Sequence, residues 1–370
     1  MVLLAEPMAL RTLHTAVAAP HFGLLAQALM HGALHLSGPI FDGVFYRGRT
    51  YLPFGPLPAV LLIPAVAAFG SGVPVLWLGV VAVVASGFGF WALWQSLGIT
   101  TAADRAWLTL ASVGGTAALS ATVVNSGYFV AHLVVIACLT WALKLALEGR
   151  AAWLCGVLVG LAALTRTNAV FAVVAMALIY WDRTSKPREI VALLLPVGFA
   201  VAVLALYNMA RFGNPLTSGY ELQNLVNPVL VSLRAQGLFS FSHLPLNLYY
   251  LLLAPPRALG GAWPWLEPSP WGMGLLFVSP WVLAALWARG RDARWLALGF
   301  GLVVMPSLLY YGIGWIQFGY RYALDGLPFL AALAAIGYRR RGFTLLPALC
   351  VASVAVNLAG ADWLLRTLGA

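Results

Sequence analysis

The sequence predicts an all-α membrane protein, built as a polytopic bundle of transmembrane helices. Three observations predict this class: 62% of the 370 residues are hydrophobic, only 9% are charged, and long apolar runs recur from Pro58 to the C-terminus. An ordinary soluble domain has about a quarter charged residues, and a spanning helix needs roughly 20 apolar residues. No polar tract is long enough for a separate water-soluble core, so we expect one membrane domain over 1–370.

Apolar runs and breaker residues locate the expected spans. A longer apolar segment, 152–181, is broken by the polar sequence Leu164-Thr-Arg-Thr-Asn168, which predicts two short helices that meet at a polar elbow. Irregular backbone at membrane depth is tolerated where it lines a cavity, so the elbow indicates a cavity. The other spans are expected at 73–97, 106–123, 128–147, 190–210, 271–288, 295–311, 321–337 and 343–359.

Two shorter helices are expected before the first span. Over 17–36, Gln27, His31 and His35 recur at every fourth position opposite an apolar face, which is typical of an amphipathic helix at the membrane interface. Residues 57–70 are apolar but short and contain two prolines, which favours a re-entrant or interfacial helix. The chain then divides into a first external loop (1–72), a helical bundle (73–210), a second external loop (211–270) and C-terminal helices (271–370).

The basic residues indicate the orientation. The net charge is +10, but the arginines and lysines are scattered between spans, which argues against nucleic-acid binding. By the positive-inside rule, the side of the short basic loops is cytoplasmic and the external loops face the extracytoplasmic side of the plasma membrane. The basic loops hold Arg105, Lys144, Arg150, Arg183, Lys186, Arg188, Arg289, Arg291, Arg294, Arg339, Arg340 and Arg341.

The segment before Glu6 is too short to span a membrane, although the first loop is expected to be external. We therefore expect that a preceding span is missing from this sequence.

Charged residues expected on the extracytoplasmic side are the candidates for chemistry. Asp42 precedes Arg47 by five residues, so a turn could bring a carboxylate and one or two guanidiniums to the membrane surface. A carboxylate there could act as a general base. The alternative is a solvated aspartate paired with Arg47, because surface ion pairs are common.

Three arginines could bind an anion. A charge at the bilayer centre costs about 2.5–3.5 kcal/mol, so Arg166 is expected to face a cavity or a phosphate, with snorkelling to the interface as the alternative. Arg321 and Asp325 open a span at i, i+4 spacing; they could neutralise each other, or this helix start, with Tyr320, could bind phosphate. Arg211 follows a span in a Gly/Asn/Pro turn, and its guanidinium could bind phosphate through two parallel hydrogen bonds. The alternative is an ordinary loop that ends the span and also holds Glu221.

The histidines are weaker candidates. His21 and His132 are more often packing or hydrogen-bonding residues than ligands, although His132 begins a span near the expected cavity. His31 and His35 have a spacing that suits a metal, but no third ligand lies at a convincing spacing, so no metal site is assigned. Motifs of soluble enzymes are absent, which places any chemistry at the membrane surface.

Four segments carry a resemblance to a known family. They are Leu24-Leu-Ala-Gln-Ala-Leu-Met-His-Gly32 with Tyr46-Arg-Gly-Arg-Thr-Tyr-Leu-Pro-Phe-Gly-Pro-Leu-Pro-Ala59, then Gly160-Leu-Ala-Ala-Leu-Thr-Arg-Thr-Asn168, Tyr207-Asn-Met-Ala-Arg-Phe-Gly-Asn-Pro215 and Phe318-Gly-Tyr-Arg-Tyr-Ala-Leu-Asp-Gly-Leu-Pro328. In order and spacing the chain resembles the GT-C superfamily of polyprenyl-phosphate-sugar-dependent glycosyltransferases. The likeness is greatest to bacterial proteins similar to protein O-mannosyltransferases and to the lipid A aminoarabinose transferase.

The resemblance implies a GT-C bundle whose first external loop forms juxtamembrane or re-entrant helices over a cavity. It implies a membrane glycosyltransferase that transfers a sugar from a polyprenyl-phosphate-linked donor to an envelope glycan, lipid or protein acceptor on the outer face. It assigns no cofactor, although a divalent metal is compatible with it. Asp42 would be the catalytic base, the donor phosphate would be held by Arg47, Arg49, Arg166, Arg211 and Arg321, and substrate would contact His21, His132, Glu221, Tyr320 and Asp325.

Two functions from other classes stay open. In a transporter or flippase of lipid-linked sugars, the same arginines would bind phosphate without catalysis. The sequence has no inverted repeat and no paired broken helices in matching halves, which are typical of such transporters. The other alternative is a catalytically silent membrane subunit that presents its outer loops to a partner.

Overall fold

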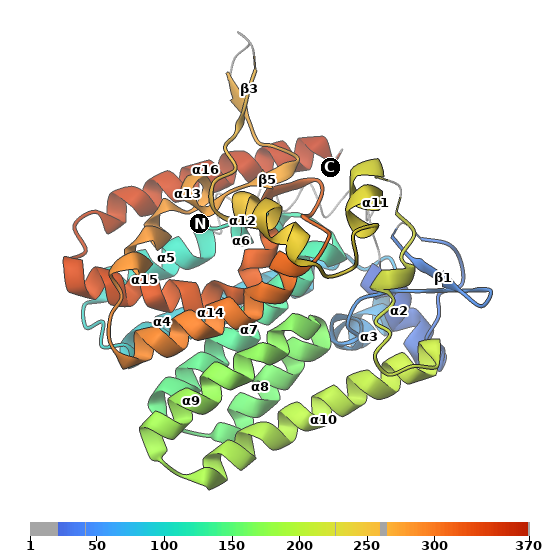
Figure 1. Cartoon of the computed structure of the whole chain (residues 1–370), viewed down its shortest axis with the longest axis horizontal. Helices are drawn as coiled ribbons and strands as arrows, with labels where there is room; N and C mark the ends of the chain where they lie inside the picture. The colour runs from blue at the N-terminus through green and yellow to red at the C-terminus, as the bar shows by residue number, and fades with distance from the viewer. Residues whose placement is uncertain (1–20, 41, 226, 260–264, 369–370) are drawn as a thin grey trace.

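In the part of the chain that the structure describes, five helices are long and apolar enough to cross a membrane. The computed structural model describes residues 21–40, 42–225, 227–259 and 265–368. The helices pack as a bundle (Figure 1), which confirms the predicted all-α class. The five are α4 (Leu76–Ser96), α7 (Gly127–Glu148), α10 (Pro187–Phe212), α14 (Arg291–Leu309) and α16 (Leu346–Thr367).

Shorter helices complete the bundle, and two of them form the predicted elbow. The apolar segment 152–181 is divided where the sequence turns polar: one helix ends at Thr165, a short 3₁₀ helix η1 (Thr167–Phe171) follows, and a second helix continues. The shorter helices are α5 (Ala102–Gly114), α6 (Ala118–Val123), α8 (Ala152–Thr165), α9 (Ala172–Thr184) and α15 (Leu327–Arg341).

The expected span at 106–123 is wrong as a single helix. Helix α5 ends at Gly114 and α6 begins only at Ala118. Two glycines in succession favour a break because glycine is a poor helix former. The carbonyl of Gly115, freed from the helix, accepts a hydrogen bond of 3.0 Å from the indole of Trp281.

The expected span at 271–288 is also wrong as a continuous helix. Strand β5 (Trp271–Met273), the short helix α13 (Leu275–Val278) and the 3₁₀ helix η4 (Pro280–Trp287) occupy it. The break falls at Ser279, whose φ of −144° is not helical, because a residue before proline is disfavoured in the α conformation. The span expected from residue 321 likewise begins with a 3₁₀ helix, η5 (Arg321–Gly326), before α15.

The first external loop contains the two helices expected there. Helix α2 (His21–Met30) packs against α3 (Leu57–Phe69), and both lie near the C-terminal end of α10 (Figure 1). Helix α2 buries one face, where Phe22, Leu25 and Ala26 are fully buried, and leaves Gln27 and Met30 exposed. It ends at Met30, and residues 17–20 lie outside the described residues. Helix α3 is roughly 20 Å long, too short for a hydrocarbon core of about 30 Å, as the sequence predicts.

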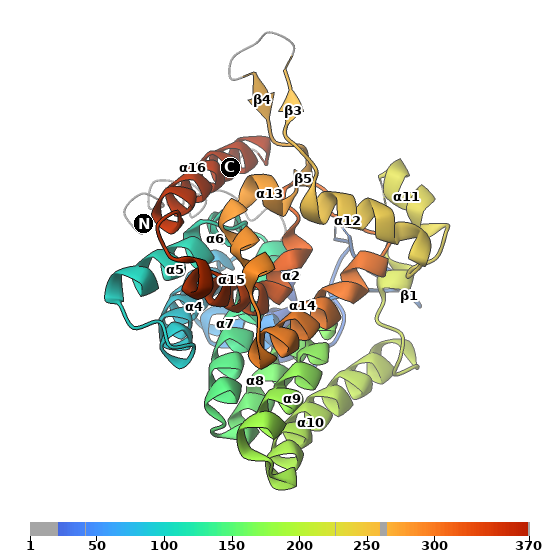
Figure 2. The same cartoon turned by 60° about the vertical axis from the view of Figure 1, so that its left-hand side comes forward.

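Strands are few and short among the described residues. A hairpin pairs β1 (Val44–Tyr46) with β2 (Arg49–Tyr51), and β5 pairs in parallel with β6 (Gln317–Gly319). A third pair, β3 (Arg257–Ala258) with β4 (Leu266–Glu267), projects from the body (Figure 2). The remaining elements are η2 (Tyr220–Leu222), α11 (Pro228–Arg234), η3 (Phe241–His243) and α12 (Leu244–Leu252).

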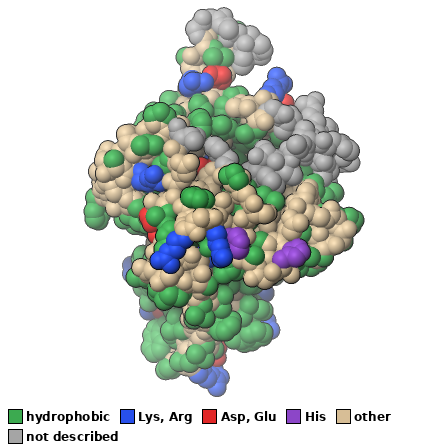
Figure 3. Space-filling model, turned by 90° about the vertical axis from the view of Figure 1, so that its right-hand side faces the viewer, with side chains coloured by type: hydrophobic (Ala, Val, Ile, Leu, Met, Phe, Trp, Pro, Cys, Tyr) green, Lys and Arg blue, Asp and Glu red, His purple; other side chains and the backbone are tan. Residues whose placement is uncertain are grey.

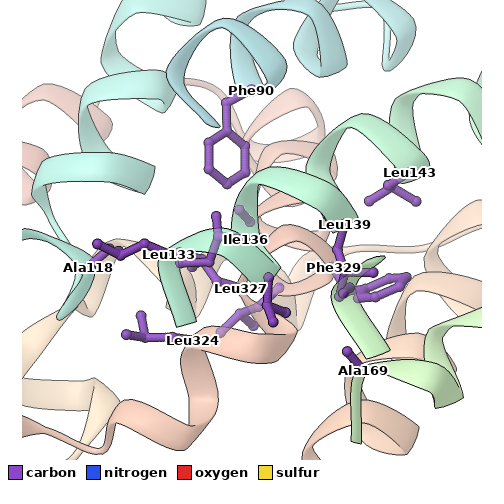
Figure 4. Packing of buried hydrophobic residues seen from close by; sticks show 14 of the residues in the cluster. Phe90, Ala118, Leu133, Ile136, Leu139, Leu143, Ala169, Leu324, Leu327 and Phe329 are labelled. Atoms are coloured by element: carbon purple, nitrogen blue, oxygen red, sulfur yellow. The ribbon is translucent and has the colours of Figure 1, made fainter. Parts of the chain in front are cut away.

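Helix α7 is the centre of the bundle. In the most apolar 18-residue stretch of α7, 72% is buried, whereas the corresponding share is 22% in α10, which lies at the periphery. Leu133, Ile136 and Leu139 of α7 pack with Phe90 from α4 and Phe329 from α15 (Figure 4). The site residues therefore pack around α7. Of the five long helices, α10 has the largest surface available for contact with lipid.

The basic loops meet at one end of the bundle. Arg339 donates a hydrogen bond to the carbonyl of Leu97, while Arg183 donates to the carbonyl of Leu147 at 2.9 Å and pairs with Asp292 at 2.7 Å. The first contact joins the end of α15 to the end of α4, and the other two join the end of α9 to the end of α7 and to the start of α14. The basic loops thus share one end, as predicted; that this end is cytoplasmic stays a prediction.

Close packing of α8 on α10 generates a test of the fold. A Cβ added at Gly156 would lie 2.2 Å from the carbonyl oxygen of Leu193, so Gly156→Ala is expected to lower the free energy of unfolding by about 1–3 kcal/mol through overpacking. The control is Gly198→Ala in α10, where nothing lies within 4 Å; it should be neutral or stabilising by up to ~1 kcal/mol. Thermal unfolding in detergent micelles measures both, and equal midpoints would contradict this packing.

Candidate functional site

Asp42 lies at the end of the bundle opposite the basic loops, just before β1. Its Oδ2 accepts a hydrogen bond of 2.7 Å from the hydroxyl of Tyr128, and the side-chain amide of Gln223 donates to its carbonyl at 3.3 Å. Its φ of 58° lies in the left-handed region that a residue with a side chain rarely adopts. Such strain persists where surrounding structure enforces it, and it is common at functional sites.

The alternative of an Asp42–Arg47 ion pair is not supported. Among the described residues, no ion pair involves either side chain. The Arg47 guanidinium lies 5.2 Å from the centre of the Tyr46 ring, and both Arg47 and Arg49 are exposed on the hairpin. The carboxylate is therefore oriented by Tyr128 and not by a neighbouring arginine.

Tyr128, at the start of α7, is a site residue that the sequence analysis missed. Besides Asp42, its hydroxyl lies 3.4 Å from Nε2 of the buried His21. Its ring meets that of Phe54 edge-on at 5.1 Å, and the Arg321 guanidinium lies 5.9 Å from its centre. The only signal in the sequence was its place in the polar segment Asn125-Ser-Gly-Tyr128, just before an apolar run. No sequence spacing links it to Asp42, which lies 86 positions earlier.

Arg321 supplies a positive charge at this end of the bundle. Its guanidinium lies 5.4 Å from the centre of the Phe129 ring and 5.3 Å from that of Tyr322, and it is half-buried. Among the described residues no carboxylate lies within ion-pair distance of it. A partly desolvated cation without a counterion is an attractive place for an anion.

The alternative that Arg321 and Asp325 neutralise each other is wrong. The segment between them is the 3₁₀ helix η5, in which three residues complete a turn and i, i+4 side chains no longer stack. Asp325 instead accepts hydrogen bonds from Nε of Arg166 at 2.7 Å and from the amide of Asn168 at 2.8 Å. Its other oxygen lies 2.7 Å from Nδ1 of His132.

This cluster explains the polar elbow. Asp325 and His132 are fully buried and the Arg166 side chain is 17% exposed, so the arginine at membrane depth is paired with a carboxylate. Asp325 contacts protein through both carboxylate oxygens, whereas the buried Nε2 of His132 has no hydrogen-bond partner among the described residues. The two side chains position Arg166, whose guanidinium lies 5.6 Å from the Tyr322 ring at the margin of the site.

The remaining predicted residues lie at the same end but have structural partners. Arg211 is buried, donates to the carbonyl of Leu52 and to Asn208 Oδ1 at 2.7 Å, and so ties the first loop to α10. Tyr320 is buried, and its hydroxyl donates to Asn247 at 3.0 Å. Glu221 is exposed and accepts hydrogen bonds that close its own turn, from the hydroxyl of Ser218 at 3.1 Å and the backbone of Gly219 at 3.2 Å.

Aromatic rings form a continuous wall beside Asp42 and Arg321. The Tyr220 ring lies 6.4 Å from Phe54 and 5.9 Å from Tyr310, which lies 6.5 Å from Tyr322. Burial raises the pKa of Tyr220 to about 12, so its hydroxyl is neutral at physiological pH and can donate a hydrogen bond. Within the described ranges, no group of three histidine, cysteine, aspartate or glutamate side chains could hold a metal ion.

The molecular face around this site carries positive charge. Viewed over α2, the first-loop hairpin and the end of α10, arginine or lysine and histidine side chains gather across the middle of the face (Figure 3). The arrangement thus combines an oriented carboxylate at Asp42, the guanidinium of Arg321 without a carboxylate partner among the described residues, and an aromatic wall. Chemically it can accept a proton at Asp42 and stabilise negative charge at Arg321.

Comparisons with known proteins show the fold. No protein-family model and no curated protein sequence matches the chain. The crystal structure of ArnT from Cupriavidus metallidurans in the apo state is similar, with a TM-score of 0.50 and 15% identity, over 92% of this chain and 59% of that one. The chain therefore shares the fold of this ArnT structure, and it spans less than two thirds of its length.

Two further solved structures are similar at a slightly lower level. ArnT from Cupriavidus metallidurans bound to undecaprenyl phosphate has a TM-score of 0.49 and 15% identity, over 92% of this chain and 60% of that one. The archaeal oligosaccharyltransferase AglB from Archaeoglobus fulgidus, in complex with an inhibitory peptide and a dolichol-phosphate, has a TM-score of 0.48 and 12% identity. That match covers 98% of this chain and 55% of AglB.

The buried cluster generates a stability prediction. Asp325→Asn removes the countercharge of Arg166 and is expected to cost about 3–5 kcal/mol, because a buried charge is left unpaired. The control is Asp362→Asn, which breaks the exposed i, i+4 pair with Arg366 and should cost less than ~1 kcal/mol. Thermal unfolding in micelles distinguishes them; a loss as small for Asp325→Asn as for the control would show that the ion pair does not hold the elbow.

Proposed function

We propose that this protein is a membrane glycosyltransferase that moves a sugar from a polyprenyl-phosphate-linked donor to an envelope glycan, lipid or protein acceptor. The observation that carries the proposal is the carboxylate of Asp42, which stands on a left-handed backbone and is oriented by Tyr128, with the guanidinium of Arg321 on the ring of the same tyrosine. The fold shared with ArnT supports it, and the class of donor is inferred from the resemblance of the four sequence segments. The site would face the extracytoplasmic side of the plasma membrane, opposite the basic loops.

The proposed reaction needs one base and one anion site. The bond between the anomeric carbon and the donor phosphate oxygen breaks, and a bond forms between that carbon and the acceptor atom. The acceptor proton moves to Asp42, whose Oδ1 has no hydrogen-bond donor among the described residues while Oδ2 is held by Tyr128. Negative charge grows on the departing lipid phosphate, so a fixed guanidinium interacts more strongly with the transition state than with the donor.

Arg321 is the arginine that we assign to the leaving phosphate. It is half-buried, it is near Tyr128, and its charge is not offset by a described carboxylate. Arg166 lies behind Tyr322 and adds positive potential, but its charge is paired with Asp325. Arg211 fastens the first loop and is expected to act indirectly, by keeping Asp42 in place.

The base is tested by Asp42→Asn. Turnover is expected to fall at least ~100-fold, the usual contribution of a general base, while donor binding is retained because the shape of the side chain is kept. The assay supplies labelled polyprenyl-phosphate sugars to protein-containing membranes and measures released lipid phosphate. Asp362→Asn, at a partly exposed carboxylate on α16, is the matched control.

Each outcome of that assay separates the functional classes. Turnover by wild type and not by Asp42→Asn supports the transferase and the assigned base. Equal turnover by both keeps the transferase and moves the base to another residue. If wild type turns over no donor of the panel while still binding one, the transporter or the silent subunit becomes the better interpretation.

The phosphate role is tested by Arg321→Gln. Loss of a preorganised charge that acts on the transition state should lower kcat by about 10²–10³, with a smaller effect on KM for the donor. Arg321→Lys keeps the charge but not the fork geometry and should recover part of the rate. The control Arg366→Gln removes an exposed arginine on α16; a decrease as large in this control would mean that net charge, and not position, matters.

A further inference from the structure

The hairpin that follows Asp42 is rigid and is fastened to the end of α10. Its two turn residues, Arg47 and Gly48, both have positive φ, at 49° and 77°, as the tight two-residue turns of hairpins require. The inner side chains Val44 and Tyr51 are buried against Phe212. The hydroxyl of Tyr46 donates to the carbonyl of Phe212 at 3.3 Å.

The length of α10 fixes the depth of this hairpin in the membrane. Helix α10 has no charged residue from 190 to 210, a stretch of about 30 Å at 1.5 Å per residue, which matches the hydrocarbon core. Its flank is apolar and open to lipid, with exposed Leu195, Phe199 and Leu206. Phe212 and the hairpin on it therefore lie at the level of the lipid headgroups.

The outer side of the hairpin has the chemistry of a headgroup contact. Phe45 is 72% exposed, and phenylalanine side chains of interfacial segments bury at the boundary between headgroups and acyl chains. Arg47 and Arg49 are exposed and, among the described residues, form no ion pair. Guanidiniums bind phosphate oxygens as a fork, and no acidic residue other than Asp42 occurs between 21 and 72.

We propose that the β1–β2 hairpin binds anionic phospholipid headgroups of the leaflet at the outer end of the bundle, with Arg47 and Arg49 as phosphate ligands and Phe45 inserted beside them. These two arginines are thereby assigned to the surrounding lipid and not to the donor phosphate. Because the hairpin begins two residues after Asp42, a headgroup bound to it also steadies the loop that carries the carboxylate. The proposal needs no turnover and stands apart from the transferase activity.

The test counts bound lipids on the intact chain. Purified protein in neutral detergent is mixed with phosphatidylglycerol or phosphatidylcholine, without polyprenyl lipid, and adducts are counted by native mass spectrometry. Wild type should prefer phosphatidylglycerol, and Arg47→Gln and Arg49→Gln should each weaken that preference about fivefold. The charge-keeping pair Arg47→Lys with Arg49→Lys should retain most of it, which guards against a loss caused by misfolding.

A matched control and a competition complete the test. Arg366→Gln also removes one exposed positive charge, but from an arginine already paired with Asp362, and it should leave the lipid preference unchanged. Equal binding of both lipids by wild type, or an unchanged preference in the double glutamine variant, would overturn the proposal. Undecaprenyl phosphate is added in a second arm: if it displaces phosphatidylglycerol one for one, the arginines hold donor phosphate instead and the proposal fails.

Discussion

The buried carboxylate of Asp325 is the constraint on which the rest of the structure depends. It joins the central helix α7, through His132, to the elbow between α8 and α9, through Arg166 and Asn168. Backbone and charge inside a bilayer need partners within the protein, so this one side chain makes a broken helix tolerable at depth. The break in turn lets Arg166 reach the rim of the site, where an unbroken helix would carry only apolar side chains.

Asp42 is held in place by residues of loops and helix ends, whereas Asp325 is held by helices inside the bundle. Tyr128 fixes its carboxylate, Gln223 fixes its carbonyl, and Arg211 fixes Leu52 at the far end of the hairpin. A left-handed aspartate is maintained by these contacts together. The first loop is thus supported from the bundle, from the second external loop and, on our proposal, from the lipid surface.

The sequence predicted the helical class, the broken helix and the common end of the basic loops, because each depends on composition or on neighbours along the chain. Two expected spans were wrong because local breakers were read as part of a helix, namely Pro280 and the paired glycines at Gly115. Most of the site residues were identified because they are charged, and charged residues are rare in this sequence. The partners of these residues could not be predicted. The 3₁₀ geometry of η5 separates Arg321 from Asp325, and Tyr128, the partner of Asp42, is uncharged and so was not among the candidates.

The order of the site residues along the chain has a consequence for biogenesis. Asp42 enters the membrane region early, Tyr128 and Arg166 follow, and Arg321 with Asp325 arrives only after more than three hundred residues have been synthesised. Until η5 is inserted, Arg166 has no countercharge and the aromatic wall lacks Tyr322. Arg166 therefore stays without its countercharge while the next 159 residues are synthesised, and this state ends only when η5 and the last helices dock.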